Sequence, residues 1–340
     1  MVSPAKGSRR WWWLALALPV LLAALGWAAV QAWLDRPLPL AHASAELSIE
    51  PGDTPRAVAE AWVRAGVQSH PEWLYQWFRW SGLARRIRAG SYEIDAGTTP
   101  RQLLDKMVQG DETLARLLLV EGWTWRQFRQ ALAAAPNLKP AAAALDDAAL
   151  RAAVGIEAAS AEGRFFPDTY AYSRGVSDLA VLKRAHAAMQ RQLAEAWSQR
   201  SPDTPLKSPD DLLILASIVE KETGPKDDPR QIAAVFVNRL RIGMPLQSDP
   251  TVIYGLGEAF DGNLRKRDLL ADGPYNSYTR AGLPPTPIAM PSRAALLAAA
   301  QPAPSRALYF VARGDGSSVF SDNLADHNRA VNQYQRGRRP

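Results

Sequence analysis

Apolar residues recur at the spacing of one helix face between Leu212 and Val219, and this face continues to an acidic residue, Glu222. Leu215, Ile218 and Val219 precede Glu222 by seven, four and three positions, so a helix stacks them on the same side as its carboxyl group. Because burial disfavours the charged form of a carboxyl group, the pattern predicts a raised pKa for Glu222. A carboxylic acid that donates a proton near neutral pH needs this property.

Capping residues mark the ends of two successive helices around this position. Ser208 is a typical cap for the first helix, and Gly224 with the proline after it should end that helix. Asp228 should cap a second helix, which Gly243 should end. The sequence therefore predicts a helical hairpin, followed at 247–251 by a polar turn that cannot lie inside a helix.

Two glutamates lie near the end of the first predicted helix, and they should have different surroundings. Glu220 is about 200° around the helix from Glu222 and is predicted to be structural or solvated. Periodicity alone also allows a plainer interpretation of Glu222, as a helix-end glutamate paired with Lys221 or Arg239.

Six blocks of sequence resemble a known family. They are ASIVEKET (Ala216 to Thr223), FVNRL (Phe236 to Leu240), GMPLQSDPTVIYG (Gly243 to Gly255), YNSYTRAGLPPTPIAMP (Tyr275 to Pro291), LYFV (Leu308 to Val311) and LADHN (Leu324 to Asn328). In order and spacing these blocks are similar to those of the endolytic murein transglycosylase (MltG, or YceG-like) family. On this resemblance, the catalytic acid of the family maps to the second glutamate of the Glu-Lys-Glu run, which is Glu222.

Composition disfavours several other classes of site. The 340 residues include no cysteine and only four scattered histidines, so we expect neither a metal nor another cofactor. The formal net charge of +6 suits an anionic polymer or a membrane surface as a neighbour. No nucleic-acid-binding motif accompanies the arginines, so a nucleic-acid partner is not expected.

The N-terminal region combines an uncharged stretch, Trp11 to Leu34, with basic residues before it, Lys6, Arg9 and Arg10. This pattern predicts a transmembrane helix at 11–34, longer than the ~20 residues that span a bilayer. The basic residues predict a cytoplasmic N-terminus, and hence a single-pass protein of the bacterial inner membrane with a periplasmic catalytic domain. A signal peptide cleaved near Ala45 is the alternative.

A short repeat follows, with one copy at Ile49 to Val58 and the other at Ile94 to Leu103. Each copy pairs a strand with a glycine turn and a Thr-Pro helix start. The region resembles the LysM-like part of the family, which implies glycan binding. Four tryptophans between the copies either stack on sugar rings or form the core of this module, namely Trp62, Trp73, Trp77 and Trp80.

The expected fold class is α+β, with a single N-terminal transmembrane helix, a small LysM-like α/β module and a mainly helical catalytic domain. We expect short strands in the catalytic domain around Val252 and from Leu308 to Val311. The expected parts are a cytoplasmic N-terminus (1–10), the transmembrane helix (11–34), a linker (35–45), the LysM-like domain (46–112), a connecting region (113–160) and the catalytic domain (161–336).

Polar and aromatic residues in the matching blocks form a candidate set for sugar binding, because amides, hydroxyls and carboxylates suit sugar hydroxyls and aromatic faces suit the ring. The candidate substrate-binding residues are Glu162, Asp168, Tyr170, Asn238, Gln247, Ser248, Asp249, Thr251, Tyr275, Asn276 and Tyr278. The loop from 162 to 170 is equally compatible with an ordinary turn whose aromatic residues are buried.

The resemblance implies a membrane-anchored enzyme that cuts the MurNAc-GlcNAc bond of nascent peptidoglycan strands and leaves 1,6-anhydroMurNAc ends. It also implies peptidoglycan synthases as possible partners. In this reaction a single glutamate acts first as acid and then as base. Two alternatives stay open: a muramidase-like hydrolase that uses Glu222 with Asp249, and a non-catalytic glycan-binding scaffold of the cell-wall machinery.

Overall fold

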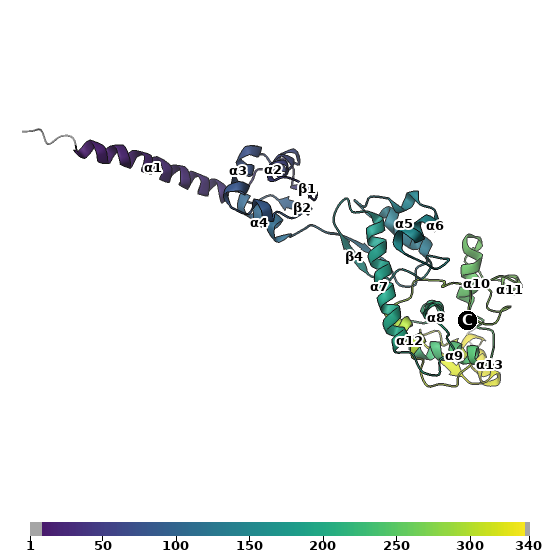
Figure 1. Ribbon diagram of the computed structural model, residues 1–340. Coiled ribbons are helices and arrows are strands. Elements are labelled where there is room, and N and C mark those ends of the chain that lie inside the picture. The colour runs from purple at the N-terminus through teal and green to yellow at the C-terminus, as the bar shows by residue number, and fades with distance from the viewer. Residues whose placement is uncertain (1–8, 337–340) are drawn as a thin grey trace, which may run out of the picture. The chain divides into compact units, whose positions relative to one another are not determined.

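The computed structural model describes residues 9–336, with side chains described from residue 18 onward. The chain divides into two compact units (Figure 1). Unit 1 contains the chain up to Ala115 together with Ser173–Gly175, and unit 2 contains Arg116–Tyr172 and the chain from Val176 onward. Each unit has helices and short antiparallel strands, so the α+β class predicted from the sequence holds.

Unit 1 is a two-stranded sheet covered by helices. Its elements are α1 (Arg9–Leu34), β1 (Ser44–Ile49), α2 (Pro55–Arg64), α3 (Pro71–Trp80), the 3-10 turn η1 (Ala84–Arg86), β2 (Gly90–Asp95) and α4 (Pro100–Gln109). Strands β1 and β2 pair antiparallel, with Leu47 opposite Tyr92. In both repeat copies the threonine caps the helix and the proline is its first residue, as the sequence predicts.

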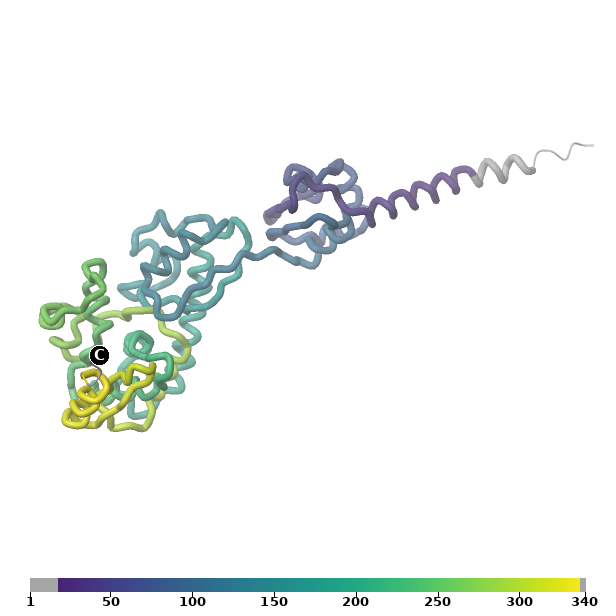
Figure 2. The backbone as a smooth tube through the Cα atoms, turned by 180° about the vertical axis from the view of Figure 1, so that it is seen from behind, coloured from purple at the N-terminus to yellow at the C-terminus, as the bar shows by residue number. Residues whose placement is uncertain are grey.

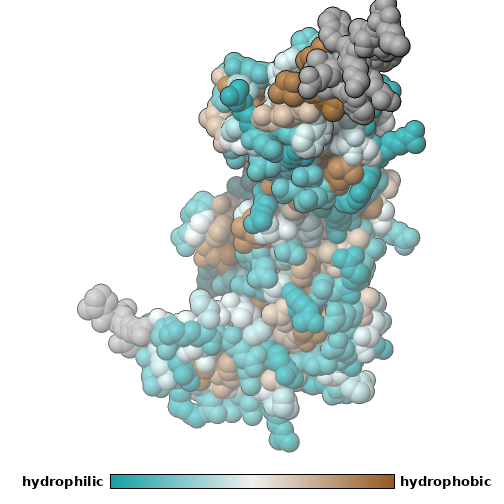
Figure 3. All heavy atoms as spheres, turned by 90° about the vertical axis from the view of Figure 1, so that its left-hand side faces the viewer, coloured by the Kyte–Doolittle hydropathy of each residue, from teal (hydrophilic) through white to brown (hydrophobic). Residues whose placement is uncertain are grey.

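The tryptophans of unit 1 divide between its core and its surface. Trp62 is completely buried, and its indole N–H donates to the sulfur of Met107 at 3.2 Å. Trp73 and Trp80 are 61% and 70% exposed. Hydrophobic residues also form separate patches on the otherwise largely hydrophilic face shown in Figure 3. The core role proposed for the tryptophans therefore applies to Trp62, whereas Trp73 and Trp80 stay available for a ligand.

The prediction of a membrane-spanning helix is wrong. Among the described residues, none of the helices combines the length and the apolar character needed to cross a bilayer. The prediction rested on the absence of charged residues from 11 to 34, but an uncharged stretch crosses a bilayer only if its helix is also long and apolar enough. In addition, Leu34 is 1% exposed and Trp33 packs on the core of unit 1.

This finding also overturns the predicted localisation. A single-pass protein of the inner membrane, with a cytoplasmic N-terminus and a periplasmic catalytic domain, requires a spanning helix, and the described residues contain none. Residues 1–8, on which part of the predicted cytoplasmic N-terminus falls, lie outside the described residues.

Unit 2 is mainly helical. Its elements are β3 (Ala115–Leu118, whose first residue is counted with unit 1), α5 (Trp125–Ala134), η2 (Ala142–Ala144), α6 (Asp147–Val154), β4 (Thr169–Tyr172), α7 (Asp178–Ser198), α8 (Pro209–Glu222), α9 (Pro229–Arg241), α10 (Asp249–Leu256), η3 (Gly257–Ala259), α11 (Lys266–Leu270), α12 (Arg293–Ala300), β5 (Tyr309–Ala312), β6 (Ser318–Ser321), α13 (Leu324–Val331) and η4 (Asn332–Arg336). The strand predicted at the end of the chain is β5, but Val252 lies in helix α10 instead of a strand.

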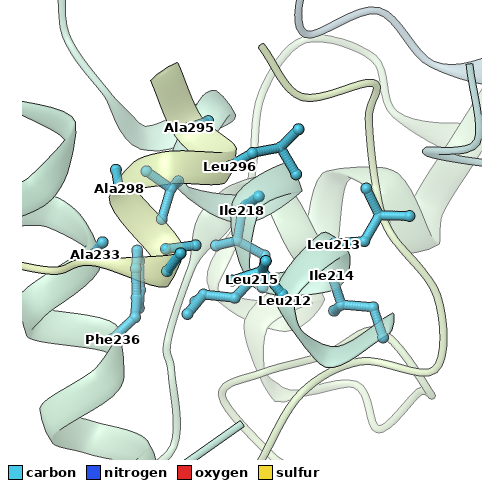
Figure 4. Packing of buried hydrophobic residues seen from close by; sticks show 14 of the residues in the cluster. Leu212, Leu213, Ile214, Leu215, Ile218, Ala233, Phe236, Ala295, Leu296 and Ala298 are labelled. Atoms are coloured by element: carbon cyan, nitrogen blue, oxygen red, sulfur yellow. The ribbon is translucent and has the colours of Figure 1, made fainter. Parts of the chain in front are cut away.

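Helix α8 forms the centre of unit 2. Leu212, Leu215 and Ile218 are each fully buried, and α8 packs against α7, α9, α10 and α12. Figure 4 shows these side chains between Leu296 of α12 and Phe236 of α9. A helix that is apolar on nearly all sides has to lie inside the protein, which explains the central position of α8.

The C-terminal elements cover one side of this core. Strands β5 and β6 pair antiparallel, with Phe310 opposite Phe320, and α13 packs on both strands. The yellow C-terminal segment lies beside α9 in both backbone views (Figures 1 and 2). The C-terminal elements therefore pack on the same helical core as α8, through the contact of β5 with α9.

Candidate active site

Glu222 is the last residue of α8, and the local sequence explains why the helix ends there. Ser208 caps the start of α8 by accepting a hydrogen bond from the backbone N–H of Asp211, as predicted. Thr223 leaves the helical conformation, and its hydroxyl donates to the carbonyl of Val219 at 2.7 Å. Val219 is fully buried, so the carboxyl group of Glu222 stands at the end of a buried face.

The surroundings of Glu222 raise its pKa from 4.5 to about 7. The largest cause is burial, which disfavours the carboxylate, and the negative charge of Asp249 acts in the same direction. The hydroxyl of Ser248 donates to Oε1 of Glu222 at 2.6 Å, and both this bond and the charge of Arg239 lower the pKa. Near neutral pH the carboxyl group can therefore both hold a proton and release it.

The loop before α10 fixes the position of Ser248. The backbone N–H of Ser248 donates to Oγ of Ser277 at 2.9 Å, and the N–H of Gln247 donates to the carbonyl of Ser277 at 2.9 Å. The hydroxyl of Thr251 bonds to the carbonyl of Ser248 at 2.7 Å and lies 2.8 Å from Oγ of Ser277. Gln247 has a φ of 51°, a left-handed conformation that non-glycine residues adopt only where the structure around them enforces it.

Asp249 and Tyr278 form a hydrogen-bonded pair beside Glu222. The hydroxyl of Tyr278 donates to Oδ1 of Asp249 at 2.5 Å. Burial, followed by this bond and by the charges of Asp249 and Glu222, raises the pKa of Tyr278, which therefore stays protonated. Asp249 is exposed and Tyr278 half-buried, so the pair offers a carboxylate and an aromatic face to a ligand.

Arg239 is a buried cation near Glu222, which the sequence indicated only as a possible pairing partner of this glutamate and not as a residue of the site. It is 7% exposed, and its guanidinium donates to the carbonyls of Leu308 at 2.7 Å and Leu246 at 2.6 Å. The guanidinium also lies over the ring of Tyr309, 5.4 Å from its centre. A charged residue inside an otherwise apolar helix face was the available signal, since such residues are seldom buried without a partner.

Two predicted site residues with amide side chains are used inside the protein. Asn238 donates from Nδ2 to the carbonyls of Ser305 at 2.9 Å and Ala307 at 3.0 Å. Asn276 is 5% exposed, donates to the carbonyl of Ala271 at 2.7 Å, and accepts from the backbone N–H of Tyr278 at 2.9 Å. These amides tie loops together, and a role in sugar binding stays a prediction.

Four further predicted site residues, Glu162, Asp168, Tyr170 and Tyr275, make no hydrogen bond to Glu222. Tyr170 is 9% exposed and donates to the carbonyl of Phe166 at 2.7 Å, whereas Asp168 is exposed. Tyr275 lies within hydrogen-bond distance of the hydroxyl of Thr286, at 2.8 Å. Glu162 is 3% exposed, and burial raises its pKa to about 7 despite the hydrogen bonds that it accepts.

Glu220, the neighbour of the candidate acid, has a structural contact. Its Oε2 accepts hydrogen bonds from the backbone N–H of Ser292 at 2.9 Å and from the hydroxyl of Ser292 at 2.6 Å. Ser292 caps helix α12. This contact explains why the two glutamates of the run differ: Glu220 holds a helix cap, while Glu222 faces Ser248.

Known proteins are similar to this chain over most of its length. The YceG-like family matches residues 47–333. The chain is 30% identical over 305 residues to the endolytic murein transglycosylase of Bacillus subtilis (strain 168), covering 85% of this chain and 84% of that protein. It is 27% identical to the endolytic murein transglycosylase of Streptococcus pneumoniae serotype 2 strain D39, covering 94% of this chain and 64% of that protein.

A solved structure is similar as well. The crystal structure of a yceG-like protein from Listeria monocytogenes covers 84% of this chain and 99% of its own, with 29% identity and a TM-score of 0.55. The chain therefore belongs to the YceG-like family. The resemblance seen in the sequence blocks is confirmed.

Proposed function

We propose that the protein is a peptidoglycan lytic transglycosylase in which Glu222 acts as acid and then as base. The observation that carries the proposal is the carboxyl group of Glu222, whose pKa of about 7 lets it exchange a proton near neutral pH. Support for the substrate comes from the relatives, which are named endolytic murein transglycosylases. By analogy with them, we propose that it cuts within glycan strands. Because synthases make the nascent strands, they are the expected partners.

The reaction needs only one titratable group. The protonated carboxyl group of Glu222 donates its proton to the oxygen that joins C1 of MurNAc to GlcNAc, and the C1–O bond breaks with both electrons on that oxygen. The carboxylate then takes the proton of the C6 hydroxyl of MurNAc while O6 bonds to C1. The products are a GlcNAc hydroxyl and a 1,6-anhydroMurNAc end, and no water is consumed. Because O6 belongs to the reacting sugar, a high effective molarity replaces an enzyme nucleophile.

Ser248 determines which oxygen of Glu222 carries the proton. Its hydroxyl donates to Oε1, so Oε1 acts as the acceptor and Oε2 is free to hold the transferable proton. After the first step the same hydrogen bond stabilises the new carboxylate. The pair therefore supports both halves of the reaction without moving.

A second candidate function is hydrolysis by Glu222 and Asp249. One observation favours it: the carboxylate of Asp249 is exposed and lies close enough to Glu222 to raise the pKa of Glu222. The hydrogen bond from Tyr278 occupies one of its oxygens, and in a hydrolase Asp249 would have to activate water or attack C1. Under the leading proposal Asp249 instead binds sugar hydroxyls.

The decisive experiment is digestion of uncrosslinked peptidoglycan strands by the purified protein, followed by mass spectrometry of the fragments. The expected fragments end in 1,6-anhydroMurNAc. Fragments heavier by one water, with a free reducing end, would establish the hydrolase instead. If the wild-type protein binds the strands but releases nothing, the scaffold interpretation is correct.

A further inference from the structure

A second buried carboxyl group, that of Glu162, lies outside the catalytic step described above. Its Oε1 and Oε2 accept from the backbone N–H of Trp125 at 2.9 and 3.1 Å, and Oε2 also accepts from the hydroxyl of Tyr254 at 3.1 Å. The side chain is 3% exposed, so its oxygens are directed at the protein and not at solvent. This geometry is that of a connector between two parts of unit 2.

One end of the connector is the start of α5. Trp125 is the first residue of α5, and Thr124 is its cap. A carboxylate here satisfies an N–H that has no partner within the helix and lies at the positive end of the helix dipole. The ring of Trp125 stacks on that of Phe165 at 4.8 Å, which holds this end of the connector in place.

The other end of the connector is helix α10. Tyr254 lies on α10, which begins at Asp249 directly after Ser248. Its ring also contacts Tyr275 edge-on at 4.9 Å, so the bond to Glu162 and the ring contact together restrain the rotation of α10. A short helix moves as one body, and the rise from Asp249 to Tyr254 is only ~7–8 Å at 1.5 Å per residue.

We propose that Glu162 is a positioning residue: through Tyr254 it fixes α10 to α5, and so holds Ser248 and Asp249 in place against Glu222. The inference rests on the proposed function in naming Glu222 as the group that reacts. It assigns Glu162 to the supporting structure of the site, in place of the sugar contact expected from the sequence. Burial raises the pKa of Glu162, as expected for a carboxyl group that makes its hydrogen bonds within the protein and not with water.

The chain provides a matched control for this connection. Glu258, in η3 directly after α10, pairs with Arg126 of α5 at 3.1 Å. It joins the same two segments as Glu162, but the side chains of Glu258 and Arg126 are 87% and 55% exposed. Exposed pairs of this kind contribute little, because water and salt screen them. Removing Glu258 should therefore have almost no effect.

Three variants, with Glu258→Gln as a fourth that serves as the control, separate positioning from chemistry. Glu162→Gln keeps an oxygen for the N–H of Trp125 and offers an N–H to the hydroxyl oxygen of Tyr254, so kcat should fall less than about 3-fold. Glu162→Leu removes the hydrogen bonds to both Trp125 and Tyr254, and Tyr254→Phe removes only the one to α10. We expect kcat to fall roughly 10-fold or more for Glu162→Leu and about 3- to 10-fold for Tyr254→Phe, with KM nearly unchanged. Glu258→Gln should stay within about 2-fold of the wild type.

The kinetic outcomes are decisive. If Glu162→Gln is as inactive as Glu222→Gln, Glu162 takes part in proton transfer and the positioning role is wrong. If Tyr254→Phe has the kcat of the wild type, the connection to α10 does not matter. If the variants only lower Tm while the folded fraction keeps its kcat, the role of Glu162 is limited to stability.

Amide hydrogen exchange provides a readout that needs no substrate. In Tyr254→Phe the amides of α10 should exchange faster than in the wild type, and in Glu162→Leu the amide of Trp125 should also exchange faster. If the wild type cleaves no glycan but these changes occur, the proposed function fails and the connection stands. Unchanged exchange in both variants would overturn the positioning role by itself.

Discussion

The hydroxyl of Ser248 donates a hydrogen bond of 2.6 Å to Oε1 of Glu222, and this bond joins the end of α8 to the start of α10. Ser248 is 1% exposed, and its backbone N–H is held by Ser277 at 2.9 Å. Glu222 therefore meets a hydrogen-bond donor whose direction is already fixed. Such preorganisation means that little has to rearrange when the carboxyl group gives up its proton.

Replacing Glu222 by glutamine should abolish glycan cleavage while leaving the fold and glycan binding nearly intact. Glutamine has the shape of glutamic acid, but its amide cannot act as an acid near neutral pH. Fragment release from purified glycan strands is the measurement, with circular dichroism as the check of folding. Full residual cleavage by the pure variant would show that another group is the acid.

Glu220→Gln is the matched control for that variant. Glu220 contacts the cap of α12 through Ser292, so we expect a loss of about 1–2 kcal/mol in the free energy of unfolding and a much milder effect on cleavage. Urea denaturation and the cleavage assay together measure both effects. Equal loss of cleavage in the two variants would contradict the assignment of the acid to Glu222.

Replacing either of two neighbours of Glu222, Ser248 or Asp249, should shift the pH dependence of kcat/KM, and the two shifts should have opposite directions. Because Glu222 must be protonated, kcat/KM should fall as the pH rises through about 7. The hydrogen bond from Ser248 lowers the pKa of Glu222 and the charge of Asp249 raises it. Ser248→Ala should thus move the alkaline limb to higher pH, and Asp249→Asn should move it to lower pH. Shifts in the same direction would be inconsistent with this electrostatic arrangement.

The carboxyl group of Glu222 should reduce the stability of the folded protein at alkaline pH. In the folded protein the pKa of Glu222 is about 7, against 4.5 for the ordinary group, so the folded state binds the proton more tightly. The contribution of Glu222 is therefore fully present below about 4.5 and is lost as the pH rises to about 7. Glu222→Gln has no such proton to lose.

The expected result is a gain in the stability of Glu222→Gln over the wild type that is near zero at pH 4.5 and levels off above pH 7 at about 1–3 kcal/mol. Glu162, whose pKa is raised in the same way, is present in both proteins and cancels in the difference. Chemical denaturation at several pH values measures this gap. A difference that does not change with pH would mean that Glu222 is not desolvated in the folded state.

The tryptophans of unit 1 should separate stability from ligand binding. Trp62→Ala removes a completely buried side chain and should cost about 3–5 kcal/mol. Trp73→Ala and Trp80→Ala remove side chains that are 61% and 70% exposed, so each should change stability by less than about 1 kcal/mol.

If the exposed tryptophans stack on sugar rings, Trp73→Ala and Trp80→Ala should weaken the retention of insoluble peptidoglycan several-fold. Pull-down by peptidoglycan sacculi, with thermal denaturation as the control, tests this point. Unchanged retention would leave the surface of α3 without a role in glycan binding.

Local patterns in the sequence determined much of the site. The apolar run that contains Leu215, Ile218 and Val219 indicated that Glu222 follows a buried segment and has a raised pKa, although the whole of 212–219 is buried and not one face alone. The residues Ser208 and Gly224 marked the ends of the helix. These predictions succeed because helical periodicity and capping depend on residues only a few positions apart.

Other sequence patterns were misleading for reasons that can be named. The absence of charge from 11 to 34 was taken as a sign of a spanning helix, but the described residues contain no helix that is long and apolar enough to span, and Leu34 at the end of the stretch is buried. Valine is common in strands, but Val252 lies in the helix that begins at Asp249. Intrinsic β-propensity is weak enough for the tertiary context to override it.

Only the tertiary structure decided how the polar residues are used. An amide such as Asn276 has the same place in the sequence whether it faces a sugar or a backbone carbonyl, and here it bonds to Ala271. The contacts of Glu162 with Tyr254 and of Glu222 with Ser248 join residues far apart in the chain. Periodicity shows which face of a helix is buried, but the partner of a polar group on that face depends on how distant segments pack together.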